Sequence, residues 1–183
     1  MVSQFISSHQ VRLLGDLDFQ FPEGTHAIGR LDQDSEGLLI LTTNKKVTKL
    51  LFERKVPHER TYLVQVNHTL SADSLHQLRS GVKIKIGAGI IYHTPPGTVE
   101  IIHHPEDKYI IDPTIPSYPP FTWILITLRE GKYRQVRKMM TAVRHKTKRL
   151  IRVSIANMTL GAMKPGEVRE VSEDDFMRGI HAE

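Results

Sequence analysis

The stretch from residue 29 to residue 44 (GRLDQDSEGLLILTTN) changes character abruptly at its midpoint. Its first half lies between two glycines and carries four charged side chains: Arg30, Asp32, Asp34 and Glu36. Its second half is almost entirely apolar and predicts a buried strand. A carboxylate-bearing loop is therefore attached directly to a rigid core element, which is a common way to hold a reactive group in place.

The rest of the chain alternates between strand-like and helix-like patterns. Apolar alternation predicts strands over 37–43, 60–66, 82–86, 90–93, 98–103, 107–111, 122–128 and 149–156. Helical spacing predicts helices over 8–16, 45–53, 71–81 and 132–144, with Asn44 and Ser71 as the caps of the second and third, and a last short helix that begins at Ser172. Four prolines in 112–120 predict a loop that joins two sub-lobes. Strands with helices scattered between them favour the α+β class over regular βαβ units.

Composition excludes several kinds of protein. The 183 residues suffice for one ordinary domain or for two small lobes that share a core. The absence of cysteine excludes disulfides, thiolate zinc sites and a cysteine nucleophile, and it fits a reducing cytosol. We see no signal-peptide pattern and no apolar run near the roughly 20 residues of a membrane helix, so we expect a cytoplasmic protein.

The positive charge is concentrated in one window. Residues 129–152 contain ten Lys/Arg against the single acid Glu130, a net charge of +9 in a chain of +5, so the remainder carries −4. Such a segment on a mildly acidic body indicates an oriented contact with a polyanion. The alternative is a solvated helical face followed by a basic loop.

Three residues are candidates for chemistry. Asp32 is ionised at neutral pH and is a competent oxygen nucleophile, although a turn aspartate often only bonds its own backbone. Tyr62 offers an aromatic platform for a nucleobase lifted out of its stack, although a tyrosine on a strand is more often a core residue. Arg137 falls on the polar flank of the 132–144 helix, beside a core stripe that contains Met139 and Met140.

These segments, in this order, resemble the signature motifs of RNA pseudouridine synthases of the RsuA/RluE type. The matching segments are GRLD at 29–32 with Gly37 and the apolar strand, RTY at 60–62, RQVRKM at 134–139, RLIR at 149–152 and LGAMKPGEVRE at 160–170. The RluE-like branch, which acts on large-subunit ribosomal RNA, is the most similar. The resemblance spans nearly the whole chain.

The resemblance implies isomerisation of a specific uridine to pseudouridine, with no cofactor and no metal. It also implies a mixed, mostly antiparallel sheet in two sub-lobes around a central RNA-binding cleft. Asp32 is then the nucleophile, and the Tyr62 ring packs against the target uridine. Arg137 forms an ion pair with Asp32, which suits a rigid guanidinium better than a lysine. Leu150 lines the pocket floor, and Arg30 either holds the extruded nucleotide or anchors the loop.

Two departures from the family pattern shape the remaining expectations. The sequence opens just beyond the place where the family's Asn-Lys-Pro strand is expected, so we expect that strand to be missing here, and we expect no N-terminal S4 RNA-binding module. We therefore expect one catalytic domain over 1–183 that acts as a monomer on ribosomal RNA. Its own basic residues would hold the RNA: Lys132, Arg134, Lys138, Arg144, Lys146, Lys148 and Arg149. The rival hypothesis is a non-catalytic RNA-binding or ribosome-assembly protein on the same scaffold.

Overall fold

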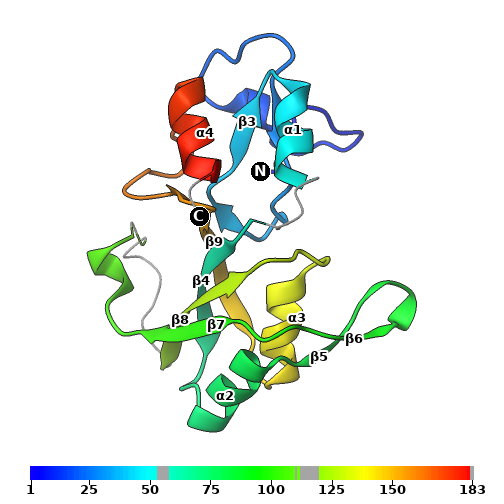
Figure 1. Ribbon diagram of the computed structural model, residues 1–183, viewed down its shortest axis with the longest axis vertical. Coiled ribbons are helices and arrows are strands. Elements are labelled where there is room, and N and C mark those ends of the chain that lie inside the picture. Colours follow the sequence, from blue (N-terminus) through cyan, green and yellow to red (C-terminus); the bar gives the residue numbers. More distant parts are fainter. Residues whose placement is uncertain (53–57, 110, 112–119, 182–183) are drawn as a thin grey trace.

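The computed structural model describes residues 1–52, 58–109, 111 and 120–181, and these form two lobes (Figure 1). A six-stranded sheet dominates the larger lobe, in the order β10-β9-β4-β8-β7, with β2 added on β9. Its strands are β2 (Glu36–Gly37), β4 (Arg60–Asn67), β7 (Thr98–Ile102), β8 (Phe121–Leu128), β9 (Thr147–Ile155) and β10 (Met158–Thr159). All pairings are antiparallel except that of β2 with β9. The predicted α+β, mostly antiparallel fold is confirmed.

The main core lies on one face of this sheet. Val64 and Val66 of β4 are fully buried there against α2 (Ala72–Ser80) and α3 (Gln135–Ala142). The helix α3 contributes Met139 and Met140, which confirms that the two methionines are packing residues. Tyr62 lies on the same face of β4 and is only partly buried. The core face therefore ends at a tyrosine that can still contact a ligand.

The smaller lobe is built on the pair β1 (His26–Ile28) and β3 (Ile40–Thr42). The helices α1 (Lys45–Phe52) and α4 (Glu173–His181) flank it in Figure 1. Its core contains Ile28, Ile40, Leu51 and Ile180, and Ile155 of β9 joins the same cluster. The lobe is thus packed onto the end of the large sheet.

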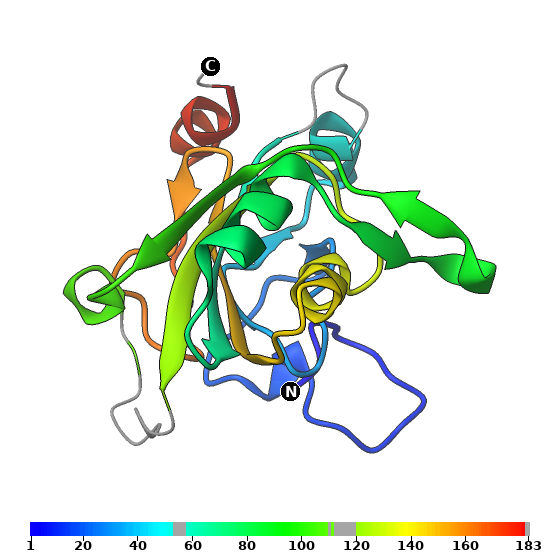
Figure 2. The same cartoon turned by 90° about the horizontal axis from the view of Figure 1, so that it is seen from below.

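The helix starts follow the predicted caps. The side chain of Asn44 accepts a hydrogen bond from the Lys46 amide at 3.0 Å, and Ser71 accepts one from Ser74 at 3.1 Å. Ser172 does the same for Asp175 at 3.1 Å. In each case a polar side chain satisfies an amide that has no partner in the first helical turn. The hairpin of β5 (Lys83–Lys85) and β6 (Ile91–His93) projects beyond the larger lobe (Figures 1 and 2).

Three predicted elements differ. Only a 3-10 turn, Leu14–Asp16, forms within the helix expected over 8–16. The strand expected over 37–43 is two strands, because Gly37 pairs with β9 whereas Ile40 pairs with β1. The strand expected over 107–111 is wrong for its described residues, since Pro105–Asp107 is a 3-10 turn and residues 108, 109 and 111 are not in a strand. The predicted joint lies mostly at 112–119, outside the described residues.

Candidate active site

Two anchors hold the loop that carries Asp32. The Ser3 hydroxyl accepts a hydrogen bond from the Leu31 amide at 2.9 Å and donates one to the Leu31 carbonyl at 3.1 Å. At the other end, a Cβ on residue 37 would lie 2.3 Å from the Arg152 carbonyl oxygen. The φ of Gly37, +105°, is also one that side-chain-bearing residues rarely adopt. Glycine at this position lets the loop lie directly against β9.

The turn between these anchors fixes the backbone of Asp32. The Ser35 amide donates a 2.9 Å hydrogen bond to the Asp32 carbonyl and closes a four-residue turn. Within the part of the chain that the structure describes, no group donates a hydrogen bond to the Asp32 carboxylate. Its side chain is 26% exposed. The carboxylate is therefore presented on a fixed backbone and keeps its oxygens available.

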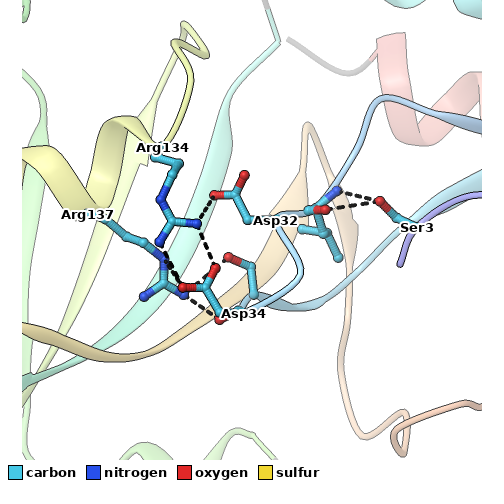
Figure 3. Close-up of polar contacts among 7 residues, drawn as sticks. Ser3, Asp32, Asp34, Arg134 and Arg137 are labelled. Carbon is cyan, nitrogen blue, oxygen red and sulfur yellow. Dashed lines mark hydrogen bonds and ion pairs between the residues drawn. The ribbon is translucent and has the colours of Figure 1, made fainter. Parts of the chain in front are cut away.

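Arg134 stands between two acids of the loop (Figure 3). Its guanidinium donates two hydrogen bonds to Asp34, of 2.9 and 2.8 Å, while its Nη1 lies 3.8 Å from Oδ2 of Asp32. Arg134 precedes α3 and has a φ of +52°, an uncommon conformation for a side-chain-bearing residue. Arg134 was predicted to be an RNA-binding residue. The structure places it beside the candidate nucleophile.

The ion pair predicted between Arg137 and Asp32 is wrong in this structure. Arg137 instead donates a hydrogen bond to the backbone carbonyl of Asp34, and its Nε lies 3.4 Å from Oδ2 of the same residue. Its Nη2 also lies 3.4 Å from the Ser35 hydroxyl. The turn brings the second acid, not the first, against the first turn of α3. Arg137 therefore holds the loop at Asp34 and Ser35 and not at the Asp32 carboxylate.

The electrostatics of the site follow from these contacts. The hydrogen bonds from Arg134 and the nearby charge of Arg137 hold the pKa of Asp34 below its ordinary value, although desolvation opposes them. Asp34 in turn raises the pKa of Arg134. One carboxylate, that of Asp34, thus pairs with both arginines. The longer contact of Arg134 with Asp32 orients that carboxylate without occupying its lone pairs.

A cavity of about 570 Å³ opens between the two lobes, within the range of small-ligand sites. Six of the predicted site residues line it, namely Arg30, Asp32, Tyr62, Lys132, Arg134 and Leu150. Leu150 is 5% exposed and Tyr62 is partly buried. An acid, an aromatic ring and an apolar floor therefore meet in one cavity. Arg137 does not line it.

Arg152 was not predicted as a site residue, because in the sequence it is only part of the RLIR strand at 149–152. Arg152 lines the cavity, is 5% exposed, and lies opposite Tyr62 in the pairing of β4 with β9. Its Nε donates a 2.8 Å hydrogen bond to the Leu38 carbonyl. Burial lowers the pKa of Arg152, and its interaction with Tyr62 opposes the shift. The available signal was a charged residue within a strand whose neighbours are apolar.

Five basic residues predicted to contact RNA lie outside the cavity. Arg149 is bound by Glu36 through hydrogen bonds of 2.9 and 2.6 Å, so it joins β2 to β9. Lys138 lies over the Tyr133 ring at 5.2 Å. The other three are exposed, namely Arg144, Lys146 and Lys148. These three residues therefore lie on the surface and do not line the cavity.

The loop 129–134 forms the rim of the cavity, and an unpredicted network braces it. Glu130 accepts hydrogen bonds from the Tyr92 hydroxyl and from Nε2 of Gln135, the latter at 2.5 Å. Oε1 of Gln135 accepts a 2.8 Å hydrogen bond from the Lys132 amide. The Lys132 ammonium lies over the Tyr92 ring at 5.1 Å. The rim is therefore tied to the projecting hairpin.

Among the described residues, no three or more His, Asp or Glu side chains are grouped to hold a metal ion. None of the helices in the same part of the chain is long and apolar enough to cross a membrane.

Comparison with known proteins gives consistent matches. The sequence model of the family described as RNA pseudouridylate synthase matches residues 15–142. Ribosomal large subunit pseudouridine synthase E of Vibrio vulnificus is 38% identical over 173 residues, 93% of this chain and 70% of that protein. The protein of the same name from Xanthomonas axonopodis pv. citri is 34% identical, over 90% of this chain and 85% of its own.

A solved structure described as a pseudouridylate synthase has the same fold. It superimposes with a TM-score of 0.69 at 25% sequence identity. The match covers 88% of the present chain and 63% of that one.

Proposed function

Since this chain belongs to the RNA pseudouridylate synthase family, we propose that it converts a uridine of large-subunit ribosomal RNA into pseudouridine, with Asp32 as the nucleophile. The large subunit is named in both relatives, which this chain matches over most of its length. The observation that carries the assignment of Asp32 is its position in the cavity. The carboxylate faces the same space as Tyr62 and Leu150 and receives no hydrogen bond from the described residues.

The reaction explains why one carboxylate suffices. Ordinary glycoside hydrolysis commonly uses two, because a water molecule must be activated as well. Pseudouridine formation retains the leaving base and rejoins it through carbon, so no water is consumed. Asp32 either attacks the ribose or the uracil ring, or removes a proton from the sugar as the base departs. Both routes need an ionised carboxylate beside a single unstacked nucleotide.

The cavity residues take roles that follow from their chemistry. The Tyr62 ring packs against the extruded base, and Leu150 forms the apolar floor below it. Extrusion of a uridine costs a few kcal/mol, less in a loop or bulge. Arg30 and Lys132 lie at exposed positions on the wall and hold the backbone of the nucleotide. The remaining predicted basic residues bind the RNA backbone without regard to its sequence: Lys138, Arg144, Lys146, Lys148 and Arg149.

We further propose that residues 1–183 act as one catalytic domain, as a monomer in the cytoplasm. One chain brings Asp32, Tyr62 and Leu150 together in the cavity, so a second copy is not needed to assemble these three residues. The lack of cysteine agrees with a reducing compartment.

The test compares wild type with Asp32→Asn on large-subunit ribosomal RNA from cells that lack the gene. Pseudouridine is mapped at each position, and RNA binding and thermal unfolding are measured in parallel. We expect wild type to form pseudouridine at one or a few positions. Asp32→Asn should form none while it retains RNA binding and thermal stability.

The same data distinguish the proposed enzyme from the rival hypothesis. Binding by wild type without any pseudouridine would support a non-catalytic RNA-binding or assembly protein. Turnover by Asp32→Asn would leave isomerisation in place but remove Asp32 as its nucleophile.

A further inference from the structure

Arg152 is a buried cation inside the cavity, and no carboxylate neutralises it. It is 5% exposed, and none of the described acids forms an ion pair with it. Its partners among the described residues are the Leu38 carbonyl and Tyr62, neither of which is a carboxylate. Its Nη2 has no hydrogen-bond partner among the described residues. Burial of a guanidinium without a carboxylate partner costs free energy. A buried arginine in a cavity therefore indicates a function that offsets this cost.

Two of the other arginines that line the cavity are paired with a carboxylate. Arg134 is bound by Asp34 at 2.8 Å, and Arg129 lies 2.9 Å from Glu59. Arg60 lines the same cavity, and its charge lowers the Arg152 pKa further. Two cations that repel each other inside a cavity create a positive potential there. An electron-rich group that enters the cavity would relieve that repulsion.

We propose that the Arg152 guanidinium hydrogen-bonds a carbonyl oxygen of the extruded pyrimidine and stabilises the negative charge that this ring gains while it is detached from the ribose. This inference rests on the proposed function and deepens it. A carbonyl is the fitting acceptor because Arg152 lies opposite Tyr62, the platform for the base, and two residues beyond Leu150, its floor. A phosphate is instead expected near the exposed cations of the wall.

The charge arises from the electron balance of the isomerisation. The bond between C1′ and N1 breaks with its electron pair going to the base, where the pair is delocalised onto the two carbonyl oxygens. A bond between C1′ and C5 then forms, C5 loses its proton and N1 gains one. A fixed donor that meets an oxygen as its charge develops lowers the barrier without needing to reorganise.

The first test uses RNA analogues with wild-type protein, so it does not depend on how Arg152 variants fold. The substrate is a synthetic RNA that carries the uridine identified by mapping. The target carries sulfur in place of O2 in one RNA and in place of O4 in another, because sulfur accepts hydrogen bonds poorly. We expect a loss on the order of 10-fold in single-turnover rate for one of the two. Unchanged rates for both would overturn the proposal.

The second test combines these RNAs with Arg152→Met and Arg152→Lys. Arg152→Met should lose on the order of 100-fold in single-turnover rate at saturating RNA, and it should no longer distinguish oxygen from sulfur. Arg152→Lys keeps the charge and should recover part of the rate. The matched control is Arg79→Met, because Arg79 donates a 2.8 Å hydrogen bond to the Val99 carbonyl outside the cavity. It should lose stability but neither rate nor the discrimination.

A methylphosphonate at the phosphate 5′ of the target identifies the competing acceptor. If wild type slows with this RNA and Arg152→Met does not, Arg152 contacts the phosphate and the proposal is wrong. An Arg152→Met variant that slows but still discriminates oxygen from sulfur would indicate a purely structural role.

A binding measurement separates failure of this inference from failure of the proposed function. RNA with a uridine at the target is compared with RNA that has an abasic ribose there. Wild type should bind the uridine RNA several-fold more tightly, and Arg152→Met should bind both equally. This preference without any pseudouridine formation would reject the proposed function but retain base recognition by Arg152. Turnover with equal binding of both RNAs by wild type would reject the inference alone.

Discussion

Arg134 donates two parallel hydrogen bonds to Asp34, of 2.9 and 2.8 Å, although the two residues lie 100 positions apart in the chain. This pair holds the guanidinium so that its Nη1 lies only 3.8 Å from Asp32. It also compensates for the positive φ at Arg134, a conformation that side-chain-bearing residues adopt at a cost. Asp34 therefore sets the position of the cation beside the candidate nucleophile.

Replacement of Asp34 by asparagine tests this relationship. Asp34→Asn removes the charge that binds Arg134, which is then free to pair directly with Asp32 and block its oxygens. We expect turnover to fall on the order of 10- to 100-fold. RNA affinity should stay equal or increase slightly, because a negative charge is lost. Single-turnover rates and filter binding measure the two effects.

Asp175→Asn is the matched control for Asp34→Asn. Asp175 pairs with Arg178 at 2.5 Å on α4 and also has a lowered pKa, but it lies outside the cavity. Its replacement should leave turnover unchanged. Full activity in Asp34→Asn would contradict the positioning role.

The pKa of Asp34 predicts how this contribution depends on pH. Its pKa in the folded protein lies below the ordinary value of 3.8, mainly because of the hydrogen bonds from Arg134. A lowered carboxylate pKa contributes stability that is complete above the ordinary pKa and is lost as the pH falls through the folded pKa. The difference in unfolding free energy between wild type and Asp34→Asn should be constant from about pH 5 to 8. It should shrink in acid below 3.8.

Urea unfolding at a series of pH values measures that difference. A gap between the two proteins that changes between pH 6 and 8 would mean that another group, not Asp34, is responsible.

The glycine at the end of the loop is required for two separate reasons. Gly37→Ala would place a Cβ 2.3 Å from the Arg152 carbonyl oxygen and force a side chain to adopt a φ of +105°. We expect a loss of about 3 kcal/mol in the free energy of unfolding, from the clash and the strained backbone together. Gly24→Ala provides the matched control, because its φ is +80° with no atom within 4 Å of the added Cβ. That variant should lose only about 1 kcal/mol.

The chemistry-bearing residues could be predicted better than their partners. Asp32, Tyr62 and Leu150 lie in one cavity as expected, because each follows from a motif with a defined place on a loop or a strand. The partner of Arg137 could not be predicted in this way. Asp32 and Asp34 are two positions apart in a turn, and sequence spacing does not say which of them faces α3. The contacts of Arg134 and Arg137 depend on how the folded turn directs the two acidic side chains.

Helix starts could be predicted where a nearby residue in the sequence determines them. The capping residues Asn44, Ser71 and Ser172 begin helices as expected, since each acts on an amide two or three positions away. The break after Gly37 was not foreseeable, because it depends on a parallel pairing with Arg152, 115 positions later. Arg152 itself shows the same limit, since only the folded sheet sets it opposite Tyr62.

Substitution of the exposed lysines on β9 and on the preceding loop tests whether this surface binds RNA. Lys146→Ala combined with Lys148→Ala should weaken RNA binding for all sequences alike. It should also reduce the slope of log affinity against log salt by roughly 1 to 2, because each lysine displaces about one counterion. The exposed Lys108 lies on the turn after β7 and serves as the control, so Lys108→Ala should leave the slope unchanged. An unaltered slope in the double variant would place the RNA elsewhere.

Arg137→Lys probes the support behind the loop. The guanidinium contacts the Asp34 carbonyl, the Asp34 carboxylate and the Ser35 hydroxyl, and it is only 12% exposed. A lysine ammonium cannot match this planar fork, so the loop should lose order. We expect turnover to fall about 10-fold or more, with RNA affinity nearly unchanged.

The partner through which Arg137 acts can be identified by a double-mutant cycle with Asp34→Asn. If Arg137 works through Asp34, as the contacts indicate, the second substitution should add little once the first is present. If Arg137 instead paired with Asp32 during turnover, the two losses would multiply, because Asp34→Asn would leave that pair intact. The cycle therefore separates the contact seen in the structure from the one predicted by the motif.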